Sequence, residues 1–552
     1  MVIMVLDIQT VSAVNNEKVP KKKRNFKRIH QYFKEYCDNT SIHGFHYLAE
    51  KRTVCEKILW LVLITTALAS CGYLISQIYS KFNQSPVIVS FATKESPIYS
   101  IPFPAVTFCP MSKARKQLFN FTDVIYKMRD KKNLTFEDKL NGQYMSLVCD
   151  FGTELFPQNE TFTDDFFQKL DEIRIPLKYL LYECKLMNVE VDCFNIFTPI
   201  ILDESVCYTY NMLDRSEIFN PNVFHFSDYH ENFQKSNWSI DEGYAKNSGR
   251  ESYPTRAFLA GADNSLQITF IQNTTDLDYL CLDDIQGFSV LLHAPYTIPL
   301  VKKQYFQVPF DRAAIAVVQP KLMTTSEAVK KYSPEKRECY FTTEKKLKYF
   351  KQYSPTNCKL ECLSNYTEQE CGCVNFYMPR EKTTPICGNG RLRCIHDAEM
   401  ALKIIQLETQ ISSDREDFFC DCKPLCTELR YNIEESQSEW DYKEQYRARG
   451  IGGFDEMGKS HPIKTGKGRS FITESSVRLA KLSVFFKQES FLTSQRNELY
   501  GPTDFLANFG GLLGLFTGFS LLSAAEILYF LTIRLCCNFR LYRSWTGANI
   551  EI

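Results

Sequence analysis

The chain has 552 residues, and its 65 Lys and Arg residues balance 65 Asp and Glu residues, so the formal net charge is zero. Nucleic-acid binding gains no support from this balance, because it usually needs a basic surface, and no nucleic-acid partner is expected. The length leaves room for two or more domains.

The first 57 residues are polar and basic, with the run 21–24 reading Lys-Lys-Lys-Arg. The apolar opening at residues 1–6 is too short for the core of a signal peptide. The basic run could be a nuclear signal or a solvated tail. An apolar segment follows closely, however, and this favours the cytoplasmic flank of a membrane span.

Residues 58–79 form the first apolar segment, which carries no charge and lies between Lys57 and Lys81. Its length fits the roughly 20 residues that a helix needs to cross a bilayer. Basic residues gather before it, so we expect the N-terminus to remain in the cytoplasm.

Residues 80–504 are expected to form an extracellular, disulfide-rich domain. Sixteen of the 21 cysteines lie between Cys109 and Cys426, which favours an oxidised framework over a cytosolic domain. Asn-x-Ser/Thr sites in the same region support this placement. Asn83 is close to the membrane, and the six sites expected to carry glycans are Asn120, Asn133, Asn159, Asn237, Asn273 and Asn365.

The dense cysteine series from Cys339 to Cys426 allows two interpretations. Thiolates at short spacings can bind zinc, but no regular finger spacing occurs and Asn365 interrupts the series. Nested disulfides that join two antiparallel segments fit better, each contributing roughly 2–4 kcal/mol. We therefore expect no metal and no cofactor.

The extracellular domain is predicted to be α+β. Runs rich in Val, Ile, Phe and Thr predict strands, and they lie at 103–108, 266–271, 287–293, 313–318 and 482–486. A helical pattern covers 398–410, with Asp397 as its expected cap. Distant strands separated by helices indicate a central sheet.

The second apolar segment, 505–533, is expected to span the membrane and to line a pore. Gly510, Gly514 and Gly518 recur every four residues, and Glu526 lies inside the apolar run. A carboxylate at this depth costs about 2.5–3.5 kcal/mol and normally faces protein or water. The glycines alone could mark simple helix dimerisation, but together with Glu526 they favour an ion pathway.

The C-terminal tail, 534–552, contains Arg534, Arg540 and Arg543. These basic residues place it in the cytoplasm with the N-terminus.

Four motifs together resemble the degenerin/epithelial sodium channel family. They are the pore-helix run 510–520 with Glu526, the segment 103–109 after the first span, the mid-domain run 287–293, and the pair His43-Gly44. The approach to the cysteine series, 333–339, is similar to the arthropod pickpocket branch.

The resemblance implies a trimer of two-span subunits in the plasma membrane that conducts sodium and is blocked by amiloride. It assigns Gly518, Phe519 and Ser520 to the selectivity filter, a constriction where the helix breaks. It assigns Ala507, Asn508, Gly511 and Leu515 to the outer gate, Glu526 to an inner carboxylate ring, and His43-Gly44 to a cytoplasmic gating motif.

The resemblance also implies eight disulfides. The expected pairs are Cys339 with Cys426, Cys358 with Cys422, Cys362 with Cys420, Cys371 with Cys394, Cys373 with Cys387, Cys109 with Cys207, Cys184 with Cys193, and Cys149 with Cys281.

Two positions depart from the family pattern. Asn508 stands where acid-sensing members often carry an acid, and Arg337 replaces the aromatic residue that they place two residues before the first cysteine of the series, Cys339. Gating by acid is therefore not expected, and the aromatic contact between thumb and membrane is in doubt.

Other functions fit the sequence less well than a channel does. A non-conducting receptor or auxiliary subunit would need only inert anchors, whereas the glycine series and Glu526 exceed that need. An ectoenzyme is not expected, because the extracellular region has no convincing metal triad, nucleophile elbow or phosphate loop. A sensory, ligand-gated role is expected. The stimulus and the choice between homomeric and heteromeric assembly stay open.

Overall fold

The computed structural model describes residues 21–84, 86–281, 286–411, 420–449, 451–454, 460–462 and 476–544. The apolar opening at residues 1–6 and the end of the tail, 545–552, lie outside this range. The chain forms two compact units. One combines residues up to Ile88 with those from Glu498, and the other covers Val89–Asn497.

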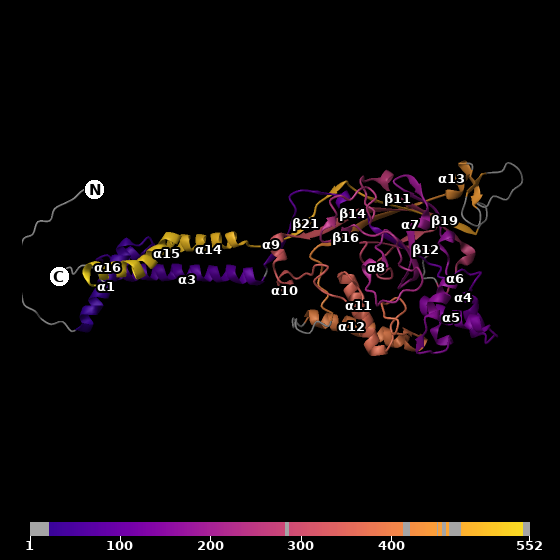
Figure 1. Ribbon diagram of the computed structural model, residues 1–552, viewed down its shortest axis with the longest axis horizontal. Helices are drawn as coiled ribbons and strands as arrows, with labels where there is room; N and C mark the ends of the chain where they lie inside the picture. The colour runs from indigo at the N-terminus through magenta and orange to yellow at the C-terminus, as the bar shows by residue number, and fades with distance from the viewer. Residues whose placement is uncertain are drawn as a thin grey trace, which may run out of the picture. The chain divides into compact units, whose positions relative to one another are not determined.

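The first unit is helical (Figure 1). Its elements are α1 (Lys21–Asn39), α2 (Phe45–Ala49), α3 (Val54–Gln84), α14 (Pro502–Thr517), α15 (Leu521–Leu528), the π-helical turn η9 (Tyr529–Ile533) and α16 (Arg534–Tyr542). Val54–Gln84 and Leu521–Tyr542 are each long and apolar enough to cross a membrane, with mean hydropathies of 2.1 and 1.4.

The first span is longer than the predicted 58–79, because α3 continues the helix at both ends. The second apolar segment, predicted over 505–533, is interrupted at Gly518-Phe519-Ser520, where the family resemblance implies a break in the helix. Helix α14 ends at Thr517 and α15 begins at Leu521. Helix α14 packs along α3, and the rings of Phe82 and Phe505 lie 5.4 Å apart.

Two sheets form the core of the second unit. The larger has the order β1-β21-β14-β19-β11-β5-β6, with β16 paired to β14, and the smaller has the order β13-β12-β3-β8-β7. The larger sheet consists of β1 (Val87–Phe91), β5 (Leu181–Leu186), β6 (Val189–Val191), β11 (Leu266–Asn273), β14 (Arg312–Thr325), β16 (Glu428–Glu439), β19 (Val477–Phe486) and β21 (Ser494–Glu498). The smaller consists of β3 (Ala105–Pro110), β7 (Phe197–Leu202), β8 (Ser205–Tyr210), β12 (Gly287–His293) and β13 (Phe306–Pro309).

The sheets pack face to face through aromatic rings. Phe108 of β3 and Phe288 of β12 both contact Phe270 of β11, at centroid distances of 5.0 and 4.3 Å, and all three are fully buried. Each such ring removes on the order of 150–250 Å² from water. Non-polar burial between the sheets therefore stabilises this α+β unit.

Helices lie around the sheets (Figure 1), and short strand pairs accompany them. The helices are α4 (Phe121–Arg129), α5 (Phe136–Cys149), α6 (Asp165–Ile173), α7 (Cys193–Ile196), α8 (Arg215–Ile218), α9 (Glu327–Lys330), α10 (Pro334–Arg337), α11 (Pro355–Cys371), α12 (Leu392–Ile411) and α13 (Tyr442–Ala448). The short strand pairs are β2 (Ser96–Pro97) with β20 (Ser490–Phe491), β4 (Thr161–Phe162) with β15 (Ile386–Cys387), β9 (Trp238–Ser239) with β10 (Gly243–Tyr244), and β17 (Ile451–Phe454) with β18 (Ser460–Pro462).

The predicted start of the helix at 398–410 was wrong. Helix α12 begins at Leu392, directly after the 3₁₀ turn Asn389–Arg391, so Asp397 lies inside the helix and cannot cap it. Arg393, four residues before Asp397, lies 3.9 Å from its carboxylate instead.

Eight disulfides cross-link the second unit, and they join the cysteines in the pairs that the family resemblance implies. The pairs are Cys109–Cys207, Cys149–Cys281, Cys184–Cys193, Cys339–Cys426, Cys358–Cys422, Cys362–Cys420, Cys371–Cys394 and Cys373–Cys387. The last five form a nested series, in which Cys358, Cys362 and Cys371 belong to α11 and Cys394 to α12.

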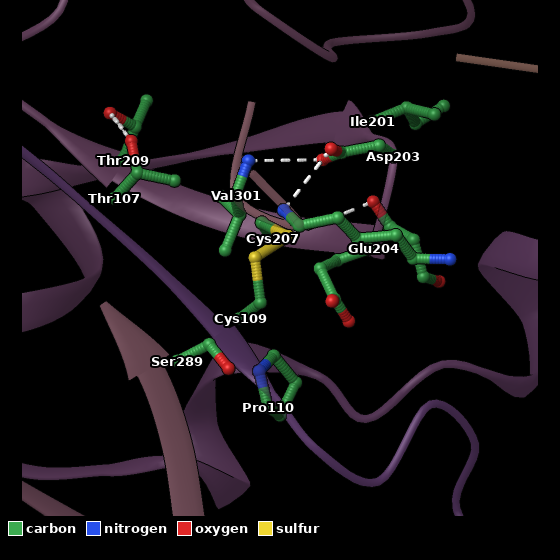
Figure 2. Close-up of a disulfide and its surroundings, with 12 residues drawn as sticks. Thr107, Cys109, Pro110, Ile201, Asp203, Glu204, Cys207, Thr209, Ser289 and Val301 are labelled. Carbon is green, nitrogen blue, oxygen red and sulfur yellow. Dashed lines mark hydrogen bonds between the residues drawn. A yellow bond between two sulfur atoms is a disulfide. The ribbon is translucent and has the colours of Figure 1, made fainter. Parts of the chain in front are cut away.

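Figure 2 shows Cys109–Cys207, which joins β3 to β8 beside the tight turn after β7. Two acids occupy this turn. Glu204 forms a buried ion pair with Lys113, and Asp203 accepts bonds of 3.1 Å from the amides of Val301 and Lys302. Burial, with the charge of Glu204, raises the pKa of Asp203 to about 6. The turn is thereby fixed to the segment after β12.

Candidate ion pathway

The break between α14 and α15 is built by one glycine and one serine. Gly518 has φ +67°, a left-handed conformation that other residues rarely adopt, and its amide donates to Gly514 O at 2.9 Å. Ser520 then caps α15, because its hydroxyl accepts from the amide of Ser523 at 3.2 Å. Non-helical backbone at membrane depth is tolerated where it is buried in protein or lines a wet cavity.

A loop before the first span reaches this break. The amide of His43 donates to Thr517 O, at the last turn of α14, over 2.9 Å. The imidazole of His43 lies against Gly518, where an added Cβ would come within 2.7 Å of the ring. The structure thus brings together two predicted motifs, His43-Gly44 and Gly518-Phe519-Ser520, that are separated by most of the chain.

Glu526 holds the same loop one turn further along α15. Its Oε2 accepts bonds from the amide and the hydroxyl of Ser41, at 3.1 and 3.0 Å. The hydroxyl of Ser41 also lies 2.7 Å from that of Ser523, which is fully buried. The carboxylate assigned to an inner ring is therefore also an anchor for residues 41–44.

Helix α1 is tied to the end of the second span. Tyr32 Oη donates to Phe530 O at 2.6 Å, within the π-helical turn where the regular backbone bonding of α15 changes. Arg534 forms an ion pair with Glu35 and lies over the ring of Phe530, 4.9 Å from its centroid. π-Turns occur frequently at functional sites.

The residues assigned to the outer gate lie on one exposed face of α14. Ala507, Asn508, Gly511 and Leu515 are all exposed in this single chain, and Asn508 Nδ2 donates to Asp504 O at 2.9 Å. At Gly510, Gly511 and Gly514 an added Cβ would meet nothing within 4 Å. Within the described residues, no part of the chain packs against this glycine face.

The six predicted glycosylation sites differ in exposure. Asn133, Asn159 and Asn237 are exposed, whereas Asn120, Asn273 and Asn365 are partly buried. Asn120 also caps α4 through a 3.1 Å bond from the amide of Asp123.

Several residues that hold the pathway together were not predicted from the sequence, namely Tyr32, Glu35, Ser41, Ser523 and Arg534. Each is an ordinary polar residue, and its partner lies on a distant segment. Only the proximity of Ser41 to His43-Gly44 offered a signal.

Comparison with known proteins places this geometry in a family. The family model described as "Amiloride-sensitive sodium channel" matches residues 36–530. Pickpocket protein 28 of Drosophila melanogaster is 27% identical over 528 residues, which cover 94% of this chain and 80% of that protein.

More distant relatives cover similar lengths. Sodium channel protein Nach of Drosophila melanogaster is 22% identical over 93% of this chain and 89% of its own. Acid-sensing ion channel 1C of Danio rerio is 20% identical over 90% of this chain and 82% of its own length. The match confirms the resemblance of the motifs: the chain belongs to the amiloride-sensitive sodium channel family, the degenerin/epithelial sodium channels, which are ion channels and not enzymes.

Proposed function

We propose that this chain is a subunit of a trimeric, sodium-selective and amiloride-sensitive channel of the plasma membrane. The observation that carries the proposal is the break at Gly518-Phe519-Ser520, held on one side by His43. Three copies of this segment around one axis would present carbonyl and hydroxyl oxygens in place of the water shell of an ion. Glu526 would attract cations on the inner side.

The proposal includes an orientation. Basic residues precede the first span and follow the second. All eight disulfides lie in the second unit. Both termini are therefore assigned to the cytoplasm, and the disulfide-rich unit to the outside, where oxidised cysteines persist. A sensory role and an extracellular ligand complete the proposal; the ligand is not specified.

The test is a current recording from cells that express this chain, under sodium and potassium gradients. Ser520→Cys is expected to change the ratio of sodium to potassium permeability and to make the current sensitive to a thiol reagent. Gly518→Ala is expected to alter the current too, because its Cβ would collide with His43 and the positive φ would be strained. Block by amiloride is measured in the same cells.

Gly72→Ala is the matched control, since Gly72 lies in the first span and an added Cβ there meets nothing within 4 Å. Unchanged selectivity in Ser520→Cys and Gly518→Ala channels would refute the filter assignment. If the surface-expressed chain never conducts, alone or with related subunits, the alternative of a non-conducting receptor or auxiliary subunit is favoured.

A further inference from the structure

A cavity of about 160 Å³ lies beside the loop that contacts the pore helix. Its walls are residues 43–45, the face of α3 from Trp60 to Leu68, and Phe516 and Thr517 of α14. It therefore lies at membrane depth, next to the backbone bond between His43 and Thr517.

The lining is apolar. Apart from His43, the side chains that surround the cavity are aromatic, aliphatic or the hydroxyl of Thr517, and that hydroxyl already donates to Leu513 O at 2.6 Å. Ordered water needs two to four polar partners, whereas a dry apolar cavity of about 150 Å³ can hold a molecule the size of benzene. The chemistry favours a hydrocarbon occupant over water.

The walls cannot easily collapse onto one another. Gly44 has φ +85°, and a Cβ there would lie 2.9 Å from Ile64, so the loop backbone already rests on α3. The ring of Tyr47 stacks on Trp60 at 4.1 Å, and the His43 amide fixes the other side to α14. The empty space is thus held open by contacts on both sides of it.

The cavity adjoins the surface of a membrane span. Leu63 and Leu68, which line it, are 49% and 50% exposed on α3. In a bilayer, the exposed face of such a helix meets lipid chains. The hydrocarbon available at this depth in quantity is therefore an acyl chain.

We propose that this cavity binds one acyl chain of a membrane lipid, and that the bound chain stabilises the loop at residues 41–45 in its position on Gly518. Binding of the chain is independent of the proposed function. Only an effect of the bound acyl chain on ion flow would rest on the proposed function, and the tests below measure no current.

The first test uses photo-crosslinking. Cells that express the full chain are fed a diazirine-labelled fatty acid, which enters their phospholipids, and are irradiated before peptide mass spectrometry. Adducts are expected on residues 43–45, 60–68 and 516–517. Ala67→Phe, which fills the cavity, should reduce these adducts at least threefold. Ala69→Phe is the control, because Ala69 is exposed on the same helix and does not line the cavity.

Equal labelling of the lining in wild type and Ala67→Phe would overturn the site. Loss of labelling in Ala69→Phe as well would also overturn it, because the effect would then belong to the helix and not to the cavity. Both variants are compared at equal surface expression, so that misfolded protein does not enter the comparison.

The second test measures hydrogen exchange at the His43 amide, which Thr517 O protects. In the wild-type protein, exchange is expected to be at least threefold slower in dioleoylphosphatidylcholine nanodiscs than in delipidated detergent micelles. In Ala67→Phe, exchange should be slow in both, because the ring replaces the acyl chain. Equal exchange of the wild type in the two media would overturn the stabilising role. A channel that failed to conduct would leave both readouts unaffected.

Discussion

Glu526 combines a contact within the chain with the inner carboxylate role that we propose for it. Both bonds from Ser41 reach the same oxygen, Oε2, so Oε1 stays outside this contact and would face the cation in the proposed channel. Charged hydrogen bonds contribute roughly 1.5–3 kcal/mol. The carboxylate can therefore hold the loop beside Gly518 through one of its two oxygens.

The first prediction concerns this contact. We expect Ser41→Ala and Glu526→Gln each to lower the permeability of sodium relative to potassium, because both loosen the loop that supports the break. The double variant should change little more than Glu526→Gln alone, since loss of the Ser41 hydroxyl weakens only the contact that Glu526→Gln already weakens. Reversal potentials under sodium and potassium gradients measure the effect.

Ser76→Ala, at an exposed position of the first span, is the control for removal of a hydroxyl. Additive effects of Ser41→Ala and Glu526→Gln would show that the two residues act separately.

His293 supplies a prediction about pH. It ends the predicted motif 287–293, is buried, and has Nε2 2.8 Å from the hydroxyl of Thr107. Burial lowers the pKa of His293 to about 4, so between about pH 6.5 and 4 the unfolded chain binds a proton that the folded chain does not. Stability is therefore lost as the pH falls through this window, by about 1.4 kcal/mol per pH unit for this proton.

We expect the free energy of unfolding of His293→Gln to depend less on pH than that of the wild type between pH 6.5 and 4.5. The difference between the two slopes should correspond to one proton. Chemical denaturation of the purified full chain in detergent, at several pH values, measures the slope. His396→Gln, at an exposed position of α12, should leave it unchanged. Identical slopes for the wild type and His293→Gln would contradict the assignment.

Arg337 illustrates what sequence reasoning could not supply at this scale. Its departure from the family pattern suggested a lost aromatic contact, but nothing in the sequence indicated a new role. In the structure the guanidinium is buried, with bonds to the carbonyls of Lys330, Tyr332 and Cys339 and an ion pair to Glu344. Such a network depends on backbone positions that only the folded chain defines.

At the scale of elements, α14 is the helix to which the family resemblance assigns the outer gate. Ala507 and Gly511 are exposed on this helix and Gly514 is partly exposed, and a Cβ added at either glycine would meet nothing within 4 Å among the described residues. Small residues permit close approach of helix backbones in a membrane. We therefore infer that copies of α14 approach one another at this face when the channel is closed.

A third prediction concerns Ala507. Added volume at a packed contact typically costs about 1–3 kcal/mol, and three copies would share the strain. If opening relieves about 1.4 kcal/mol of it, the ratio of open to closed channels rises roughly tenfold. We expect Ala507→Val to give a standing sodium current without a stimulus, measured at equal surface expression.

Ala69→Val, at an exposed position of the first span, should stay silent under the same conditions. Silent Ala507→Val channels, in cells where the wild type can be opened, would rule out close packing at this residue.

Most elements were predictable where the local pattern is strong. The run 287–293 is β12, 266–271 lies in β11, and the Gly-Phe-Ser break falls where the sequence placed the constriction. The start of α12 was not predictable, because a 3₁₀ turn continues into the helix. Contacts such as Ser41 with Glu526, which join opposite ends of the chain, carry no local signal at all.

At the scale of the whole molecule, the single chain leaves its glycine face without a partner among the described residues. Lipid chains give a helix no strong reason to keep three glycines on one face, whereas a second copy of the helix does. A head-to-tail contact repeated around an axis closes into a ring. The family match adds that related subunits assemble as multimers, and we propose a ring of three.

The last prediction tests this ring and the part that the glycines play in it. Single-molecule photobleaching of the fluorescently tagged full chain in the plasma membrane should show three steps for most complexes. Gly514→Leu is expected to reduce the three-step fraction, because its side chain would enter the backbone contact between copies, and a tenfold loss would correspond to about 1.4 kcal/mol. Gly72→Leu is the matched control, since Gly72 also lies in a span with nothing near its Cβ position. Three steps in all variants would mean that the disulfide-rich unit alone holds the trimer, and one or two steps in the wild type would refute the ring of three.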